Sequence, residues 1–387
     1  MVGEQQLVHR DRRPRLVAIA ASVLVMAGVG YLAVGRIGSE ETVVAQGSAA
    51  IPTSFGTWQT MADAPIETRP YAVTAWTGSE FVVWAGSSLS RGFAYTDGAI
   101  YQPDTDSWEL MNVPGWGHPG LTSAFFDGEL YALAKGGGTR FDPIAGRWSD
   151  LPPVEGMLLT ATVATDQGVW GLGPASVNDS GQPDLAIAEF DPASDSWLYG
   201  PEFEGTDRQA EIVAGMGLLE TTTLWTGTEI VVWRSTTGGI AFNPATESWR
   251  TIPHPQSPSG LIHSSIAVQL DDGIAVLAQV ENSDGIAVDV ATLQADGGWQ
   301  WLETDIPVSD FDSITVAGAG DWIAMFSADE DPALIHLPSG TWQRETDGPL
   351  GGIRAPNIAW TGNQLIVWGG VTDDADAADG ATWTPPG

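Results

Sequence analysis

The sequence predicts an all-β protein built from repeated four-stranded units, and three observations lead to this prediction. The 387 residues include 47 glycines, 25 prolines and 18 tryptophans, a composition typical of a turn-rich β protein. An aromatic residue, then proline two positions later, then tryptophan, recurs along the chain. Pairs of short apolar segments around a Thr-Gly turn precede this pattern. Because the units recur every 40 to 52 residues, they match the blades of a β-propeller.

The N-terminal region predicts a membrane anchor. Residues 1–15 form a basic tail that we expect in the cytoplasm, and residues 16–35 contain no charged side chain. Twenty apolar residues in a helix span about 30 Å, the thickness of a bilayer core. Positive flanks stay inside, so we expect a single-pass anchor with everything after it extracytoplasmic. A signal peptide cleaved after Val43-Val44-Ala45 is the alternative. Residues 36–53 are expected to form a flexible stalk.

The charge of the chain excludes one class of partner. The formal net charge is −34, and nucleic-acid binding needs a basic surface. Without residues 1–36, the remainder has 10 basic against 47 acidic residues, a charge of −37. There is no cysteine, which excludes disulfides, thiolate metal sites and cysteine nucleophiles. The acidic residues gather in predicted turns, where they favour solubility.

The tryptophan pattern gives the number of blades. Four segments place an aromatic residue seven positions before tryptophan, and a fifth is one residue shorter: 101–108, 141–148, 190–197, 242–249 and 336–342. Outer-strand tryptophans are then expected at Trp58, Trp108, Trp148, Trp197, Trp249, Trp299 or Trp301, and Trp342. Seven inner hairpins also fit, the clearest at 72–86, 222–235 and 357–370. Because the chain begins with a lone tryptophan strand at 56–61, we expect that strand to complete the last blade and close the ring.

These residues resemble the kelch-repeat family of β-propellers. Kelch units carry a double glycine after the second strand, then an aromatic residue and a tryptophan. Gly369-Gly370 matches the double glycine, Ala85-Gly86 matches in part, and Gly136-Gly137-Gly138 matches with a shift, whereas Arg234-Ser235 lacks it. The resemblance covers residues 54–387 and departs in the unit at 263–302. It implies a kelch-like seven-bladed propeller whose aromatic residues pack between blades.

Residues that suggest catalysis or metal binding are few. The five histidines, at positions 9, 118, 254, 263 and 336, show no metal-binding spacing, so structural or solvated roles are favoured. The loop Asp373–Asp379 suggests calcium, but it lacks the spacing and the terminal glutamate of a calcium loop, and a solvated loop is favoured. Asp104, Asp106 and the pair Asp191 and Asp195 are better explained as turn residues. We therefore predict no catalytic residue, no metal site and no cofactor.

Two of the scarce arginines are the predicted binding residues. Arg69 precedes Trp76 by seven residues and Arg354 precedes Trp360 by six, which suggests equivalent positions in neighbouring blades, at the mouth of the central channel. Two guanidinium groups there would bind a carboxylate or sulfate. The structural alternative is that each pairs with a nearby acid such as Glu67 or caps a loop. Arg208 is a weaker third candidate.

The sequence favours a non-enzymatic function. We expect a membrane-tethered, extracytoplasmic recognition module that binds a partner protein or an envelope glycan and no nucleic acid. A propeller-type carbohydrate-active enzyme, similar to sugar epimerases or sialidases and using paired carboxylates at the channel mouth, is the alternative. Fold does not decide between them.

Overall fold

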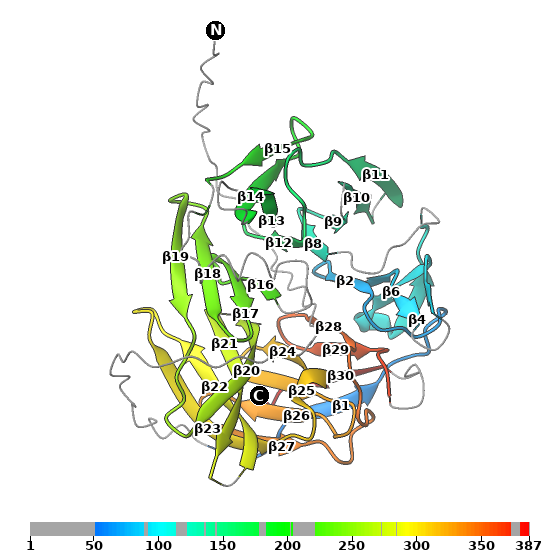
Figure 1. Cartoon of the computed structure of the whole chain (residues 1–387). Coiled ribbons are helices and arrows are strands. Elements are labelled where there is room, and N and C mark those ends of the chain that lie inside the picture. The colour runs from blue at the N-terminus through cyan, green and yellow to red at the C-terminus, as the bar shows by residue number, and fades with distance from the viewer. Residues whose placement is uncertain are drawn as a thin grey trace.

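Seven four-stranded antiparallel sheets are arranged around a central axis in the computed structural model (Figure 1). The predicted all-β, seven-bladed propeller is therefore confirmed. Within the described residues, no helix is both long and apolar enough to cross a bilayer. The anchor predicted at residues 16–35 lies outside the described residues and stays a prediction. The structure describes residues 51–88, 92–113, 122–134, 137–143, 145–177, 183–201, 203, 221–271, 273–283, 285–372 and 380–386.

Each of the first four blades is a meander of four consecutive strands, with one small insertion. Blade 1 contains β2 (Val73–Trp76), β3 (Phe81–Trp84), β6 (Gly98–Gln102) and β7 (Ser107–Leu110). Between β3 and β6, the chain forms a small two-stranded sheet of β4 (Ser87–Ser88) and β5 (Phe93–Ala94). Blade 2 contains β8 (Thr122–Phe126), β9 (Glu129–Ala134), β10 (Gly137–Asp142) and β11 (Arg147–Leu151). Blade 3 contains β12 (Ala161–Ala164), β13 (Val169–Val177), β14 (Pro183–Asp191) and β15 (Ser196–Tyr199). Blade 4 contains β16 (Thr221–Trp225), β17 (Ile230–Arg234), β18 (Gly238–Asn243) and β19 (Ser248–Pro253).

Among the last three blades, blade 5 has the longest strands and blade 7 closes the ring. Blade 5 contains β20 (Leu261–Leu270), β21 (Gly273–Asn282), β22 (Gly285–Leu293) and β23 (Trp299–Pro307). Blade 6 contains β24 (Thr315–Ala319), β25 (Trp322–Phe326), β26 (Ala333–His336) and β27 (Thr341–Arg344). Blade 7 contains β28 (Asn357–Trp360), β29 (Leu365–Trp368), β30 (Gly380–Thr384) and, from the other end of the sequence, β1 (Thr57–Thr60). Short 3-10 turns at Pro103–Thr105 and Phe311–Ser313 complete the elements.

The N-terminal strand closes the ring as predicted. Strand β1 pairs antiparallel with β30, from Thr57 opposite Thr384 to Thr60 opposite Ala381, and the two lie side by side in Figure 1. Trp58 thereby stands opposite Trp383, with ring centroids 6.4 Å apart. The segment Trp383-Thr384-Pro385 is thus a further copy of the aromatic–x–proline pattern, and its tryptophan partner lies at the other end of the chain.

The ring has two different faces because each blade starts with its innermost strand. We call the face where the innermost strands begin the entry face, and the opposite one the exit face. The exit face carries the turns between first and second strands. At Thr77, Thr226 and Thr361 the threonine hydroxyl accepts the backbone N–H three residues later, at 2.9–3.0 Å. The following glycine has a positive φ near 90–100°, so the Thr-Gly hairpins of the sequence are confirmed.

The repeated aromatic–Asx–proline motif forms the other exit-face turns. The aromatic residue pairs across the sheet with the outer-strand tryptophan, as Phe190 does with Trp197. The next residue caps the turn, since the Asp191 carboxylate accepts the N–H of Ala193 at 3.1 Å. Asp142 and Asn243 make the same kind of bond. The predicted turn role of Asp191 is therefore confirmed, because Asx side chains bond their own backbone.

Outer-strand tryptophans join each blade to the preceding one. In six blades the indole Nε1 donates to a backbone carbonyl at or after the preceding outer strand, at 2.7–3.1 Å: Trp108, Trp148, Trp197, Trp249, Trp299 and Trp342. Trp299 takes this place in blade 5, which decides between the two predicted positions. Trp58 is the exception in the described chain, because its buried Nε1 has no hydrogen-bond partner.

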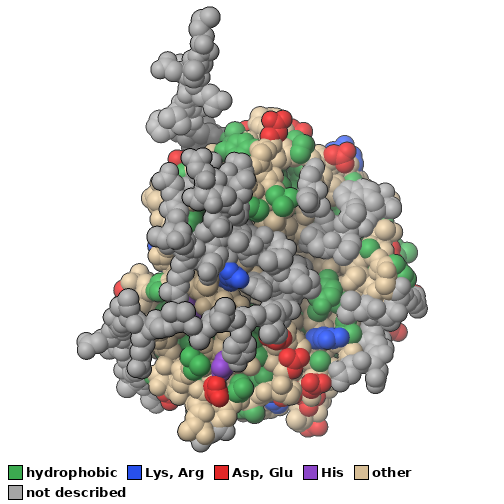
Figure 2. Space-filling view, viewed as in Figure 1, with side chains coloured by type: hydrophobic (Ala, Val, Ile, Leu, Met, Phe, Trp, Pro, Cys, Tyr) green, Lys and Arg blue, Asp and Glu red, His purple; other side chains and the backbone are tan. Residues whose placement is uncertain are grey.

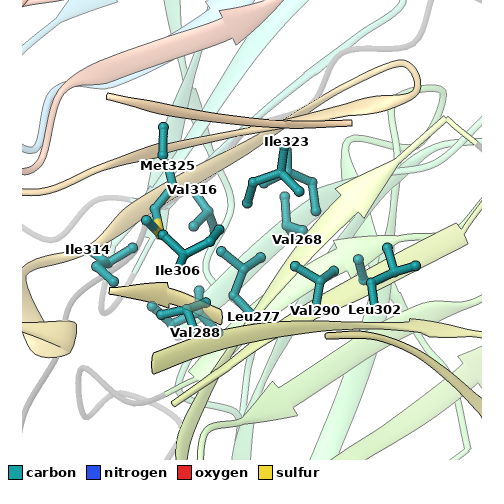
Figure 3. Close-up of a cluster of buried hydrophobic side chains, with 14 of the residues drawn as sticks. Val268, Leu277, Val288, Val290, Leu302, Ile306, Ile314, Val316, Ile323 and Met325 are labelled. Carbon is teal, nitrogen blue, oxygen red and sulfur yellow. The ribbon is translucent and has the colours of Figure 1, made fainter. Parts of the chain in front are cut away.

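The core is divided among the seams between blades. Each seam has its own cluster of buried apolar side chains, seven clusters in the described residues. Figure 3 shows the cluster between blades 5 and 6, where Val288 and Ile306 meet Val316 and Met325. Such burial supplies most of the folding free energy, so every blade depends on both neighbours.

Candidate functional site

The two predicted arginines lie at one seam of the entry face. Arg69 belongs to the connection from β1 to β2, and Arg354 to the connection from β27 to β28. Their main chains flank the double glycine of blade 7. A Cβ on Gly369 would lie 3.1 Å from the Arg69 carbonyl oxygen, and one on Gly370 would lie 2.9 Å from that of Arg354. The structure therefore brings both connections together between blades 7 and 1.

The Arg69 side chain is fully buried and held by internal partners. Its Nε donates to the Glu67 carbonyl at 2.6 Å, and its Nη1 donates to the Asp97 carboxylate at 2.5 Å and to the Ala85 carbonyl at 3.3 Å. The guanidinium lies 3.9 Å from the centre of the Tyr95 ring, a cation–π contact. The Tyr95 hydroxyl in turn donates to the Glu67 carboxylate at 3.0 Å. We call Glu67, Arg69, Tyr95 and Asp97 the Arg69 cluster.

One atom of the cluster has no hydrogen bond within the described chain. The Nη2 of Arg69 is buried and unpartnered, which costs free energy for a charged donor. The Asp97 side chain is 50% exposed and Phe93, on the β4–β5 insertion, is 45% exposed. The Phe93 ring meets Tyr95 edge to face at 5.1 Å. An exposed aromatic ring and a carboxylate thus stand beside a buried guanidinium.

Arg354 has a different environment from Arg69, and the expectation of equivalent positions is wrong by one residue. Tyr71 and Ala355 mark the true correspondence, because both have a positive φ, 57° and 48°, just before the first strand. Arg69 therefore matches the buried Ile353, whereas Arg354 is exposed. Successive side chains in extended backbone point to opposite sides, so one position of offset turns one arginine inward and the other outward. Whether either binds a ligand stays a prediction.

Asn357, which was not predicted from the sequence as a site residue, joins blade 7 to the connection before blade 1. Asn357 is buried, and its side-chain Nδ2 donates to the Arg69 carbonyl at 2.7 Å and to the Trp368 carbonyl at 3.1 Å. Its Oδ1 accepts the N–H of Ala72 at 3.1 Å. The only signal in the sequence was an amide where the corresponding position of blade 1 has an apolar residue. Two of these bonds join Asn357 to the connection that leads into blade 1, and the third holds it to its own blade 7.

The double-glycine conformation is present even where one glycine is replaced. Gly369 and Gly370 have φ of 66° and 103°, and Ala85 and Gly86 have φ of 59° and 97°. Ala85 thus adopts the left-handed conformation that glycine favours. The second position needs glycine for two reasons: its φ of 97° strains any side chain, and a Cβ on Gly86 would lie 3.0 Å from the Arg69 Cδ. The motif therefore shapes the entry loops rather than supplying a chemical group.

The innermost strands that surround the axis carry hydroxyl and amide groups. As described, β2, β8, β12, β16, β20, β24 and β28 contain no Asp, Glu, Lys or Arg. Some of their polar side chains reach the preceding blade, as when the Ser123 hydroxyl donates to the Thr74 carbonyl at 3.4 Å. Gln269 similarly accepts the N–H of Trp225 at 3.5 Å. These strands can offer neutral hydrogen bonds.

The described histidines have structural contacts. His254 stacks on Trp233 with ring centroids 5.7 Å apart, and its Nε2 lies 3.1 Å from the Ser265 hydroxyl. His263 pairs with Glu281 at 2.7 Å. Burial lowers the pKa of His336, whose Nδ1 lies 2.7 Å from a serine hydroxyl.

Several other predicted positions cannot be placed. His9, His118, Arg208 and the acidic loop Asp373–Asp379 lie outside the described residues. In the part of the chain that is described, no three His, Asp or Glu side chains come together as metal ligands would. The interpretation of residues 373–379 as a solvated loop therefore stays a prediction.

Comparison with known proteins adds no family. The chain matches no protein-family model and no curated protein sequence. The fold is therefore established by the seven sheets themselves, and the kelch resemblance rests on the repeated residues.

Proposed function

We propose that this chain is a kelch-like propeller that works as a recognition module and binds its partner through the entry face. A β-propeller suits either a binding or an enzymatic role. The observation that carries the proposal is the difference between the two faces. The described exit-face turns are short, and several close on their own side chains, as at Thr77, Thr226 and Asp191. The entry face instead carries the β4–β5 insertion and the exposed side chains Phe93, Leu261, Ile286 and Arg354.

Contiguous exposed apolar surface marks interaction sites, and arginine is enriched among the residues that carry most of the binding energy of protein interfaces. Figure 2 shows apolar and acidic side chains interspersed on one face of the molecule. We further propose that residues 16–35 tether the propeller to a membrane and that it lies outside the cytoplasm, with a protein or an envelope glycan as its partner. The apolar length of that segment and its basic flank support this part of the proposal.

The test compares one variant on each face. The full-length chain is screened on glycan and peptide arrays, and the ligands found are measured again with Phe93→Ser combined with Arg354→Gln. Arg147→Gln combined with Leu198→Ser is the matched control, since it changes an exposed arginine at the exit face and an exposed leucine on an outer strand. We expect the entry-face variant to weaken binding about tenfold or more and the control to leave it within about twofold. Equal effects of both variants, or loss only in the control, would contradict the proposal.

A carbohydrate-active enzyme is the second candidate, and one observation favours it. The Asp97 carboxylate accepts a bond from Arg69, and the Glu67 carboxylate accepts one from Tyr95, whose ring lies against the same guanidinium. Paired carboxylates are the usual catalysts of glycoside cleavage. Glu67→Gln and Asp97→Asn would each abolish such an activity while leaving ligand binding in place. Binding that persists without any turnover of the bound glycan assigns the chain to recognition.

A further inference from the structure

Blade 5 projects beyond blade 6 on the entry face. Gln269 of blade 5 and Gly318 of blade 6 lie side by side, since a Cβ on Gly318 would collide with the carbonyl oxygen of Gln269. Strand β20 begins eight residues before Gln269, at Leu261, whereas β24 begins three residues before Gly318, at Thr315. At about 3.3 Å per residue, the five-residue difference is roughly 16 Å. The entry-face end of β20 therefore extends past the start of β24, the first strand of blade 6.

The uncovered end of blade 5 displays an apolar row with an acid at its centre. Leu261, Glu281 and Ile286 are direct neighbours across three strands, so their side chains share one side of the sheet. They are 65%, 54% and 49% exposed, and one carboxylate oxygen of Glu281 lies 2.7 Å from the Nε2 of His263. The same side of the sheet carries Val288, which packs into the cluster against blade 6. We call Leu261, Glu281 and Ile286 the overhang.

An acidic surface lies next to the overhang, on top of blade 6. The loops 308–314 and 327–332 carry it, and they are joined by a 3.1 Å bond from the Ser309 N–H to the Glu330 carboxylate. Arg344 is already paired with Glu330 at 2.6 Å. The remaining acids of the two loops, which we call the acidic shelf, are Asp310, Asp312, Asp329 and Asp331. Burial, and to a smaller extent the charge of Asp310, raise the pKa of Asp312, so these two neighbouring carboxylates repel each other.

Shared packing places the shelf beside the overhang. Phe311 and Ile314, which flank Asp312, are buried in the same cluster as Val288 (Figure 3 labels Ile314 and Val288). Val288 is two residues from Ile286 along β22, about 7 Å. An apolar row and an acidic shelf therefore adjoin at the seam between blades 5 and 6, away from the Arg69 cluster.

We propose that the overhang and the acidic shelf together dock a basic segment of a partner protein that also carries apolar side chains. This inference rests on the proposed recognition function and names its partner class. Apolar residues of the segment would cover Leu261 and Ile286, and its lysine or arginine side chains would meet Glu281 and the shelf, which removes the repulsion there. A second copy of this chain is a poor occupant, because the chain has a net charge of −34 and two copies would repel each other. Leucine and isoleucine also lack the flat ring on which a sugar would stack.

The test measures binding of a short fluorescent peptide in which leucine and lysine alternate, by anisotropy, to the full-length protein in detergent. Peptides that alternate serine with lysine and leucine with glutamate serve as ligand controls, and detergent alone gives the background. The test variants are Leu261→Ser with Glu281→Gln, and Asp312→Asn with Asp329→Asn. The matched protein control is Leu110→Ser with Glu109→Gln, an exposed leucine and an exposed acid on the outer strand of blade 1.

We expect the leucine–lysine peptide to bind best, and added salt to weaken it. Each test variant should lose about tenfold in affinity, while the blade 1 control stays within about twofold. Equal binding by the overhang variant and the parent overturns the inference, as does displacement of the peptide by a glycan that binds elsewhere on the entry face. If the parent protein self-associates and the overhang variant does not, the inference is also overturned, because the overhang then binds a second copy of the chain. Array ligands that depend on Phe93 and Arg354 but ignore the overhang would overturn this inference alone, and the proposed function would stand.

Discussion

Removal of the closing strand is the most demanding test of the ring. Deletion of residues 54–61 takes away β1, and with it Phe55, Trp58 and Met61. Met61 is 8% exposed within the cluster between blades 7 and 1. Phe55 is half-buried and packs edge to face on Trp322 at 5.3 Å. The deletion therefore opens two seams at once, because Met61 packs between blades 7 and 1 while Phe55 and Trp58 pack between blades 6 and 7.

The magnitude follows from these contacts. Loss of a buried methionine costs about 2–5 kcal/mol, and loss of a half-buried phenylalanine and tryptophan roughly half of the 3–5 kcal/mol expected for buried ones. The total is roughly 5–10 kcal/mol, before the buried Trp383 Nε1 loses its bond to the Phe55 carbonyl at 2.8 Å. Because a domain is stable by about 5–15 kcal/mol, we expect the truncated chain to lose cooperative folding.

Urea unfolding followed by tryptophan fluorescence measures the effect. Deletion of residues 50–53, which include the 69% exposed Ile51, is the control and should leave the midpoint unchanged. A synthetic peptide covering 54–62, added in excess, should restore part of the lost stability by binding in place of β1. A truncated protein that unfolds at the midpoint of the parent would refute the role of closure.

Three further predictions concern single positions. Trp197→Phe should cost about 1–2 kcal/mol more than Trp58→Phe in urea unfolding, because only the first loses a hydrogen bond; equal losses would contradict the role of the indole bonds. Arg69→Gln should lower the free energy of unfolding by roughly 2–4 kcal/mol and Arg354→Gln by less than about 0.5 kcal/mol, and similar melting curves would contradict the difference in burial. Burial raises the pKa of Asp289, so the folded state binds its proton more tightly and stability falls as pH rises through that titration. Asp289→Asn keeps the bonding geometry and should flatten that slope in thermal melts at several pH values; an unchanged slope would assign it to other groups.

Local chemistry made most of the fold readable from the sequence. The Thr-Gly hairpins were predictable because threonine and glycine each supply something the turn needs, a hydroxyl acceptor and a positive φ. Tryptophan spacing gave seven blades because each tryptophan occupies one place in its blade. Trp383 escaped notice because its partner, Trp58, is separated from it by the whole propeller.

The candidate sites were less predictable because they depend on the direction of single side chains. Spacing from a tryptophan placed Arg69 and Arg354 on the right connections. However, their positions differ by one residue, which is why the Arg69 side chain is buried and the Arg354 side chain is exposed. The overhang depends on the length of blade 5 relative to blade 6. Within one blade, alternation of apolar residues continues past the point where its neighbour ends, so a single strand does not show where cover is lost.

The closing strand also determines how the molecule would carry a mechanical load. Any pull transmitted through the residues before Phe55 acts first on the aromatic contact with Trp322 and on the bond to Trp383, and then on the four residue pairs between β1 and β30. If the chain is tethered at its N-terminus and its entry face holds a partner, tension between the two passes through blade 7. The ring would then yield at its closure, and the strength of the attachment would be set by Phe55 and β1.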